Sequence, residues 1–391
     1  MKKKVMFRII SLQMGVVPKV LIDILKNLDR DKFELFVLLN INQGDLLKDI
    51  PVDVNVIALQ KGKEQMSRIR FFRFFQMIKR NIILKLYKHF PSLIKRKIFE
   101  IPDIEIAITH SSLPELLKSP FRNSKKINWF HTDIIWHHSK DYGKDLAKMM
   151  QKCDLTVFVS LYSKITFEKY LNVKLKNSLC IHNPFDVNDI LYKSHLDSCN
   201  ANSFFSEKVK TFVSTGRLVF AKGYDVLIDV HAELLDEGFD HRIIVIGDGN
   251  ELIFLQRKIR TLGVESSFVL LGNINNPYPY IKNADYYIQP SRYESYPIAL
   301  GEALILNIPI ICTDVGGVSE LLSHEKTAYI VNFEKDTLKE AMKNFMQNTL
   351  LIEKIRKEQS NFQANEYNRK IYSKINNILL KISRDEVPSE L

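Results

Sequence analysis

Short apolar runs of strand length alternate with amphipathic stretches of helix length along most of the chain. This alternation is typical of α/β units with parallel sheets. In the first half, the pattern predicts a helix at 18–28 and strands at 5–10, 33–39, 54–59, 104–109, 127–130 and 155–160. In the second half, it predicts strands, each followed by helix-compatible sequence, at 211–215, 243–246, 268–271, 286–289, 308–312 and 328–331.

The two series are separated by a polar stretch at 197–206 that lacks regular signals and is predicted to be a linker. We therefore predict an α/β fold with two Rossmann-like domains, at 1–195 and 207–367. Their ligand sites would lie at the carboxyl ends of the strands and face each other across a cleft. A final helical stretch at 368–383 is predicted to pack back on the first domain.

The composition indicates a globular protein, because 391 residues with 46% hydrophobic content can bury the cores of two domains. Arg8 interrupts the only apolar run near the start, so we expect no signal peptide. No window holds the roughly 18 to 20 apolar residues that a spanning helix needs, which predicts a cytoplasmic chain. The cysteines are far apart and indicate neither a disulfide framework nor a zinc site: Cys153, Cys180, Cys199 and Cys312.

The formal charge of +11 comes from one segment, because residues 61–97 hold twelve Lys or Arg and one acidic residue, and the remainder balances. Within it, five apolar residues recur at helical spacing: Phe71, Phe75, Ile78, Ile82 and Leu86. A basic helix with an aromatic face suits an anionic membrane surface. A core-facing helix with a solvated basic side is the other interpretation. We expect no nucleic acid partner, because no recognition module is visible.

The densest candidate site is the stretch 291–303, which follows one predicted strand and precedes another. Pro297 suits the first turn of a helix, so Glu294 falls in the entering loop and Glu302 inside the helix. The amides of residues 295–298 would attract an anion or a hydroxyl-rich ligand. Taken alone, the stretch also fits an ordinary capped helix.

Residues 286–321 resemble the retaining GT-B glycosyltransferases of family 4, also called the glycosyl transferases group 1 family. The shared features are the Glu-x7-Glu motif at Glu294 and Glu302 and the downstream block at 308–320. The resemblance implies a GT-B fold, with Glu294 holding hydroxyls of the donor sugar and Glu302 binding the ribose. It also implies that the backbone of Ser295, Tyr296, Pro297 and Ile298 lines the sugar and phosphate pocket. Ser295 stands where the family usually has Gly, so sugar specificity can differ.

A second motif, at 214–223, offers two cations, Arg217 and Lys222, at a predicted strand end. A departing diphosphate gains negative charge, and fixed cations aimed at it stabilise that charge. On pattern alone, a solvated Arg and Lys flanking a turn would also fit. The order of the family's motifs favours the phosphate role.

Three weaker motifs acquire roles from the same resemblance. The turn at Gly247 lacks the third glycine of a dinucleotide fingerprint, yet in the family this turn borders the nucleotide. Asn273 and Ile274 resemble the segment that contacts the base. Gly15 stands where family members often carry two glycines beside the diphosphate.

His131 ends a predicted strand, where many relatives have a histidine that faces the donor sugar; a structural histidine is the other interpretation. Asp133, His137 and His138 lie near it, but their spacing fits no zinc pattern, so we predict no metal site. Asp29 and Asp31 form an Asp-x-Asp pair that we place at a surface turn.

Together these features predict an enzyme: a metal-independent, retaining hexosyltransferase without a cofactor. Its donor would be a nucleotide-diphosphate sugar, with UDP-sugars favoured, carrying a hexose or N-acetylhexosamine. Its acceptor would be a lipid-linked or growing cell-surface glycan at the inner face of the cell membrane, reached through residues 61–97. The alternatives are a soluble acceptor, a nucleotide-sugar epimerase of the same fold and a non-catalytic scaffold subunit.

Overall fold

The computed structural model describes residues 2–13, 15–98, 100–137, 139–196, 204–205 and 209–386. The chain divides into two compact units, one formed by residues 1–184 and 367–391 and the other by 185–366. The sequence predicts a first domain that ends at 195, whereas residues 185–194 group with the second unit. Packing explains this, because Phe185 lies against Gly301, and the Asn276 side-chain amide donates to the Lys193 carbonyl at 2.9 Å. Most of the predicted linker lies outside the described residues.

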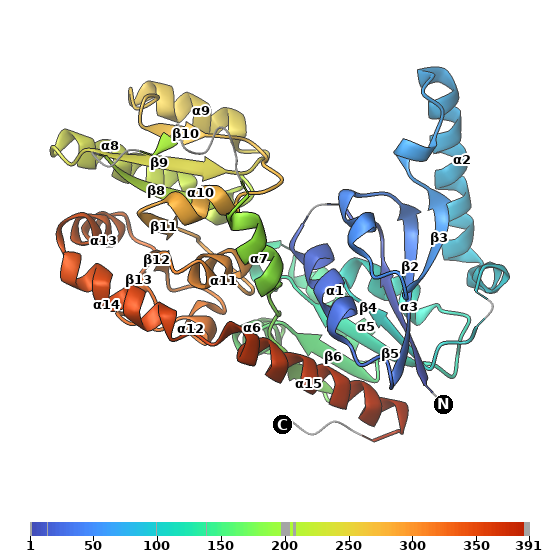
Figure 1. The fold of residues 1–391 in the computed structure, drawn as a ribbon. Coiled ribbons are helices and arrows are strands. Elements are labelled where there is room, and N and C mark those ends of the chain that lie inside the picture. The colour runs from blue at the N-terminus through green and yellow to red at the C-terminus, as the bar shows by residue number, and fades with distance from the viewer. Residues whose placement is uncertain are drawn as a thin grey trace. The chain divides into compact units, whose positions relative to one another are not determined.

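The first unit contains a parallel sheet of seven strands within the described residues, in the order β3-β2-β1-β4-β5-β6-β7 (Figure 1). The strands are β1 (Lys3–Ile9), β2 (Phe33–Asn42), β3 (Asn55–Lys61), β4 (Ile104–Ala107), β5 (Lys125–Phe130), β6 (Leu155–Phe158) and β7 (Ser178–Cys180). The helices are α1 (Val16–Asn27), α2 (Arg70–His89), α3 (Leu113–Leu117), α4 (Ile134–His137), α5 (Lys140–Met150) and α6 (Leu161–Leu171). Residues from Tyr367 onward in α15 (Ala364–Ser383) also group with this unit.

The inner strands of this sheet are covered on both faces, so they are mostly apolar rather than alternating, although they also bury polar residues such as Arg8 and Glu105. One face carries Met6, Leu38 and Leu59, which pack beneath α2. Further along the same sheet, Phe130 and Phe158 pack against helices α3, α5 and α6. Helix α15 lies beside α1, joined by a hydrogen bond from the Tyr372 hydroxyl to Asp23.

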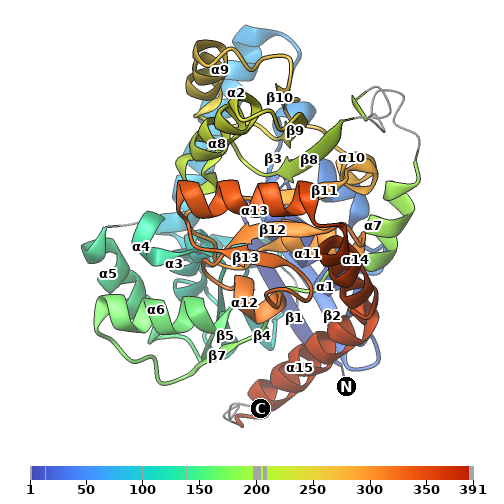
Figure 2. The same cartoon turned by 90° about the vertical axis from the view of Figure 1, so that its left-hand side faces the viewer.

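The second unit is built on a parallel sheet with the order β10-β9-β8-β11-β12-β13 (Figure 2). Its strands are β8 (Lys210–Thr215), β9 (His241–Ile246), β10 (Phe268–Leu270), β11 (Tyr286–Gln289), β12 (Ile310–Thr313) and β13 (Tyr329–Val331). Its helices are α7 (Val187–Ser194), α8 (Tyr224–Asp236), α9 (Leu252–Thr261), α10 (Tyr278–Asn283), α11 (Ile298–Ile305), α12 (Val318–Leu321), α13 (Lys335–Gln347) and α14 (Thr349–Ser360). The main core joins this sheet to α8, α9, α13 and α14.

The predicted fold class is confirmed, because each unit is a parallel α/β sheet of the Rossmann type. None of the helices in the described part of the chain is long and apolar enough to span a lipid bilayer. Among the described residues, Cys153, Cys180 and Cys312 form no disulfide bond, and Cys199 lies outside this part of the chain. The Asp29–Asp31 pair lies in a turn in which the Asp31 N–H donates to the Asp29 carboxylate at 2.9 Å.

Candidate functional site

The candidate site of the second unit lies at the carboxyl edge of its sheet. The strand order places β9 and β10 on one side of β8, and β11 and β12 on the other. The strand order therefore reverses between β8 and β11, and the loops after these two strands run to opposite sides of the sheet. Open α/β sheets bind ligands in the crevice between two such loops. The loops after β8 and β11, at 216–223 and 290–297, border this point and carry the predicted cations and Glu294.

Glycines bring these loops into direct backbone contact. Gly316, with φ +61°, lies so close to the Glu294 carbonyl that a Cβ would overlap it. Gly223, with φ +66°, approaches the Pro290 carbonyl in the same way. Only glycine combines a left-handed backbone with such close approach. The loops after β8, β11 and β12 are therefore fixed against one another.

The predicted Gly247 turn takes part in the same packing. Gly247 follows β9 and has φ +155°, and a Cβ there would overlap the carbonyl of Gly216. The Leu218 N–H donates to the Asp248 carbonyl at 3.0 Å, which joins this turn to the loop after β8. The structure thus gives Gly247 a packing role, and contact with a nucleotide stays a prediction.

Lys222 and Glu294 form the centre of the site. Their side chains make an ion pair that is mostly buried, with 19% and 12% of the two side chains exposed. Gln289 and Ser291 also donate to the same carboxylate oxygen, Oε1, at 2.8 Å each. The other oxygen of Glu294, Oε2, has no hydrogen-bond partner among the described residues. One oxygen is thus occupied, and the second can accept a bond from a ligand hydroxyl.

Arg292 fastens the Glu294 loop to the segment that carries Lys222. Its guanidinium donates to both carboxylate oxygens of Asp225 at 2.6 Å and to the Phe220 carbonyl at 2.8 Å. It also lies 3.9 Å from the centre of the Phe220 ring. Burial raises the pKa of Asp225, but the hydrogen bonds and charge of Arg292 outweigh burial and hold it below its ordinary value. The carboxylate and guanidinium are therefore both charged and paired.

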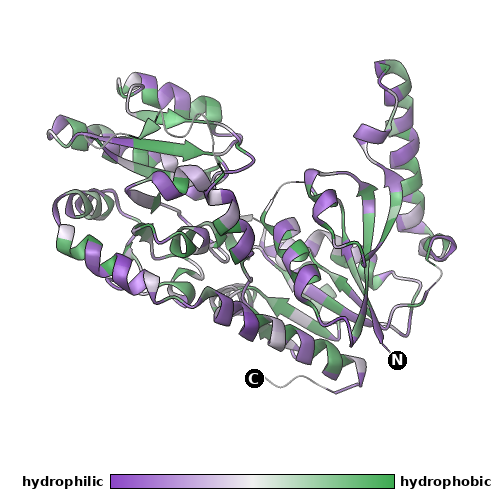
Figure 3. Ribbon diagram, in the orientation of Figure 1, coloured by the Kyte–Doolittle hydropathy of each residue, from purple (hydrophilic) through white to green (hydrophobic). Residues whose placement is uncertain are grey.

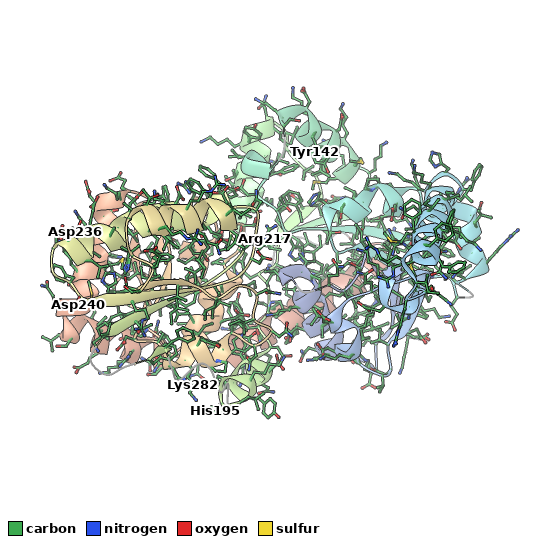
Figure 4. The ribbon with its side chains drawn as sticks, turned by 90° about the horizontal axis from the view of Figure 1, so that it is seen from above. Tyr142, His195, Arg217, Asp236, Asp240 and Lys282 are labelled. Atoms are coloured by element: carbon green, nitrogen blue, oxygen red, sulfur yellow. The ribbon has the colours of Figure 1, made fainter. Side chains whose placement is uncertain are left out.

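Arg217 lies at the same edge of the sheet but is exposed. Figure 4 shows it at the end of the second unit opposite to Asp236 and Asp240. In the described residues, no hydrogen bond or ion pair joins Arg217 to Lys222 or Glu294. The preceding residue, Gly216, borders the Lys222 side chain, because a Cβ there would lie 3.2 Å from Lys222 Cε. The structure thus brings Lys222 and Glu294 together and leaves the Arg217 side chain available to a ligand.

Glu302 lies on α11 and is 93% buried, with 7% of its surface exposed. The hydroxyl of Tyr278 donates to its Oε1 at 3.0 Å. Burial, followed by the charge and hydrogen bond of Glu302, raises the pKa of Tyr278 far above its ordinary value. Tyr278 therefore stays protonated and keeps the carboxylate oriented.

The turn before α11 differs slightly from the prediction. Pro297 is the N-cap of this helix rather than part of its first turn, so α11 begins at Ile298. The Ile298 N–H donates to the Tyr296 carbonyl at 3.1 Å, which engages one of the predicted ligand-binding amides. Asn273 and Ile274 follow the end of β10 at the same edge, where the Gly272 carbonyl accepts from the Gly247 N–H at 2.8 Å.

In the first unit, His131 follows the end of β5 and stacks on Trp129. Neither ring nitrogen of His131 has a hydrogen-bond partner among the described residues, although both are buried. Burial, and secondly the charge of His110, lowers the pKa of His131 to about 3. The imidazole is therefore neutral at physiological pH, and it does not fit the alternative of a structural histidine with satisfied hydrogen bonds.

Gly15 lies at the start of α1, beside the point where this sheet changes direction between β1 and β4. Its backbone is extended, and a Cβ would lie 3.7 Å from Pro18 Cδ and 4.0 Å from the Gln13 carbonyl oxygen, both ordinary contacts. The structure therefore gives no steric reason for glycine there. His138 and the side chain of His137 lie outside the described residues, and Asp133 accepts from the Ile135 N–H at 2.9 Å. Within either unit, no three described His, Cys, Asp or Glu side chains converge on one point.

Four residues that sequence reasoning did not single out support the site: Gln289, Ser291, Arg292 and Tyr278. Ser291 and Arg292 lie within the candidate stretch 291–303, so their place in the sequence could have identified them as site residues. Gln289 and Tyr278 carry no such signal, because only the folded chain brings them to the two glutamates.

Comparison with known proteins identifies the second unit. Residues 200–369 match the model of the family described as "Glycosyl transferases group 1". The second unit is a glycosyl transferases group 1 domain. The whole chain has the GT-B fold, since it is similar to the Anabaena Alr3699/HepE structure in complex with UDP and glucose. That likeness has a TM-score of 0.75 at 19% identity and covers 95% of this chain and 99% of the other.

Curated relatives that this chain matches carry the names of transferases. It is 31% identical over 123 residues to 2-deoxystreptamine N-acetyl-D-glucosaminyltransferase of Niallia circulans, covering 31% of this chain and 32% of the relative. It is 26% identical to N-acetylgalactosamine-N,N'-diacetylbacillosaminyl-diphospho-undecaprenol 4-alpha-N-acetylgalactosaminyltransferase of Campylobacter jejuni, covering 55% and 56%. The chain spans about a third to just over half of the length of these two relatives.

Proposed function

We propose that the protein is a retaining glycosyltransferase whose donor is a nucleotide-diphosphate sugar, most favourably a UDP-sugar. It transfers a hexose or N-acetylhexosamine to a lipid-linked or growing cell-surface glycan, such as a capsule, lipopolysaccharide or exopolysaccharide. The observation that carries the proposal is the Lys222–Glu294 pair at the carboxyl edge of a group 1 domain. It joins a fixed cation to a carboxylate with one free oxygen, as a diphosphate sugar requires.

The roles follow from the charges that the reaction creates. When the bond between the sugar C1 and the diphosphate oxygen breaks, negative charge grows on the phosphate. Lys222 is held in place by Glu294, and the exposed Arg217 can form two bonds to phosphate oxygens. These two cations serve in place of a metal ion in the proposed mechanism. The free Oε2 of Glu294 accepts from a sugar hydroxyl, and Glu302 binds the ribose.

Transfer with retention requires the acceptor to approach the face that the diphosphate leaves. The acceptor hydroxyl bonds to C1, and its proton passes to the departing phosphate oxygen, so a nucleoside diphosphate and a glycoside are the products. The neutral His131 offers a hydrogen bond to the donor sugar. Exclusion of water from the site makes hydrolysis of the donor much slower than transfer.

The acceptor class is supported by a relative whose name includes a diphospho-undecaprenol compound. With an acceptor of this class, the proposed reaction takes place at the inner face of the cell membrane. The name of the Niallia circulans relative, which includes 2-deoxystreptamine, favours a second candidate, a soluble acceptor.

A panel of nucleotide sugars tests the proposed function. Wild-type protein is incubated with each donor in the presence of EDTA, and nucleoside diphosphate release and the anomeric configuration of the product are followed by NMR. We expect turnover of one donor class with a retained configuration, and loss of turnover in Glu294→Gln and Lys222→Met. Lys258→Met, which removes the more exposed ion pair with Asp229, is the matched control and should remain active. An inverted product, a requirement for added metal, free epimerised sugar or no turnover of any donor would each contradict the proposal.

A further inference from the structure

Helix α2 presents two different faces. Leu84 and Tyr87 pack against the cluster that covers the first sheet, and Arg80 is the buried residue of the helix. At about 100° per residue, these three lie within a narrow arc on the inner side of the helix. Figure 1 shows α2 beside the edge strand β3, extending beyond the ends of the strands. The helix therefore has a defined inner face and an outer face that this unit leaves uncovered.

The outer face is apolar, contrary to the usual arrangement of a surface helix. We call it the Phe stripe, and its members are Phe71, Phe72, Phe74, Phe75, Ile78, Ile82 and Leu86, each between 40% and 66% exposed. Neighbouring rings touch each other, with the Phe71 and Phe75 centroids 4.8 Å apart. Figure 3 shows hydrophobic and hydrophilic segments alternating along this helix. A contiguous exposed patch of this kind marks an interaction site.

The charges around the Phe stripe are of one sign. Helix α2 contains no acidic residue, and the segment 61–97 carries the entire net charge of the chain. Lys79 and Lys85 are exposed and flank the stripe, each roughly 60° from its centre on an ideal helix. Long lysine side chains in this position reach a phosphate layer while the apolar side chains enter the hydrocarbon boundary.

We propose that the Phe stripe of α2 docks on an anionic lipid bilayer, with its rings inserted at the headgroup boundary and Lys79 and Lys85 on lipid phosphates. Charge decides against a second copy of this chain, because a symmetric contact through α2 would bring two strongly basic segments together. A soluble anionic polymer would engage the lysines but leave the apolar rings in water. An anionic membrane surface accepts both features at once. The biological reason for membrane docking rests on the proposed function, but lipid binding itself can be measured without any transferase activity.

Vesicle flotation tests the proposal with purified full-length protein. Vesicles contain either phosphatidylcholine alone or phosphatidylcholine with about 30 mol% phosphatidylglycerol. We expect wild type to float with the anionic vesicles and at least about tenfold less with neutral ones, with the anionic binding weakened by salt. Replacing Phe71, Phe72, Phe74 and Phe75 by Ser should reduce binding at least about tenfold.

Matched variants separate the contributions of the apolar rings and of the lysines to vesicle binding. Ile253→Ser with Phe254→Ser removes exposed apolar groups from α9 and should float like wild type. Lys79→Gln with Lys85→Gln should weaken anionic binding about tenfold, whereas Lys144→Gln with Lys152→Gln, also exposed, should not. Donor hydrolysis without vesicles should be unchanged in all four variants. That readout separates a failure of the membrane proposal from a failure of the proposed activity.

Equal flotation of wild type and the Phe variant would overturn the proposal. So would a wild-type dimer in light scattering that the Phe variant abolishes, because the stripe would then join two copies. Wild-type binding to RNA that competes with vesicles and is equal in the Phe variant would also overturn it, since the lysines alone would then explain the surface.

Discussion

The link between Arg292 and Asp225 makes a specific prediction about how the site is held together. Replacing Arg292 by Met removes both 2.6 Å bonds to Asp225, the bond to the Phe220 carbonyl and the ring contact. The Asp225 carboxylate, whose side chain is 22% exposed, then loses its counter-charge. The Glu294 loop also loses a tether to the segment that carries Lys222.

The size of the effect follows from burial. Removing one partner of a fully buried ion pair costs about 3 to 5 kcal/mol, whereas an exposed pair contributes about 0 to 1 kcal/mol. The Arg292 and Asp225 side chains are mostly but not fully buried, at 13% and 22% exposed. We therefore expect Arg292→Met to lower the free energy of unfolding by about 2 to 3 kcal/mol. Asp225→Asn should cost less, and the double variant should cost less than the sum of the two.

Urea unfolding followed by circular dichroism measures these free energies, and initial rates measure transfer. Arg292→Met should lower kcat about tenfold or more, because even a small displacement of a site residue strongly reduces the reaction rate. Lys258→Met, which breaks the more exposed pair with Asp229, is the control and should cost less than about 1 kcal/mol. If Arg292→Met unfolds at the wild-type urea concentration and the double variant is additive, the tether does not contribute as argued.

Three further outcomes follow from the second unit. Gly316→Ala should lower the free energy of unfolding by at least about 2 kcal/mol in urea, because a Cβ would overlap a neighbouring carbonyl; Gly238→Ala, at φ +84° with open space around it, should cost less. Burial, and secondly the charge of His241, lowers the pKa of His231 to about 3 in the folded protein. As the pH falls below the ordinary pKa of 6.5, the unfolded chain takes up a proton on His231 and the folded protein does not, so the free energy of unfolding decreases. The wild type should therefore lose about 2 kcal/mol more than His231→Gln between pH 7 and pH 5, and equal losses in urea titrations would disprove the assignment. Tyr278→Phe removes one hydrogen bond that orients the Glu302 carboxylate and should raise the donor KM about threefold to tenfold with kcat unchanged; a fall in kcat alone would contradict the ribose role.

The positions of most strands along the chain could be predicted from the sequence, because parallel strands covered on both faces are mostly apolar runs. Strand β1, for example, matches a run predicted at 5–10 and found at Lys3–Ile9. Strand β7 has three residues, Ser178–Cys180, which is too short for such a run to show. The end of the first unit could not be predicted from the sequence either. Residues 185–194 belong to the second unit because they contact Gly301 and Asn276, which lie about 80 to 120 positions later in the sequence.

The sequence singled out Lys222 and Glu294 as candidate site residues but could not predict the bond between them. Lys222 and Glu294 were chosen separately, and their pairing depends on two loops that meet only when β8 and β11 become neighbours. The partner of Arg292 is equally distant in sequence. In α2, periodicity identified the apolar face but could not say whether it points inward. The structure buries Arg80 and exposes Phe71, the reverse of what composition favours.

A crystal structure of the protein with a non-hydrolysable nucleotide-diphosphate sugar tests the central claim most directly. We expect nitrogens of Arg217 and Lys222 within about 3 Å of phosphate oxygens, and a carboxylate oxygen of Glu294 at the same distance from a sugar hydroxyl. We also expect Glu302 to contact the ribose. A ligand bound elsewhere, or bound at this edge without contact to Lys222 and Glu294, would contradict it.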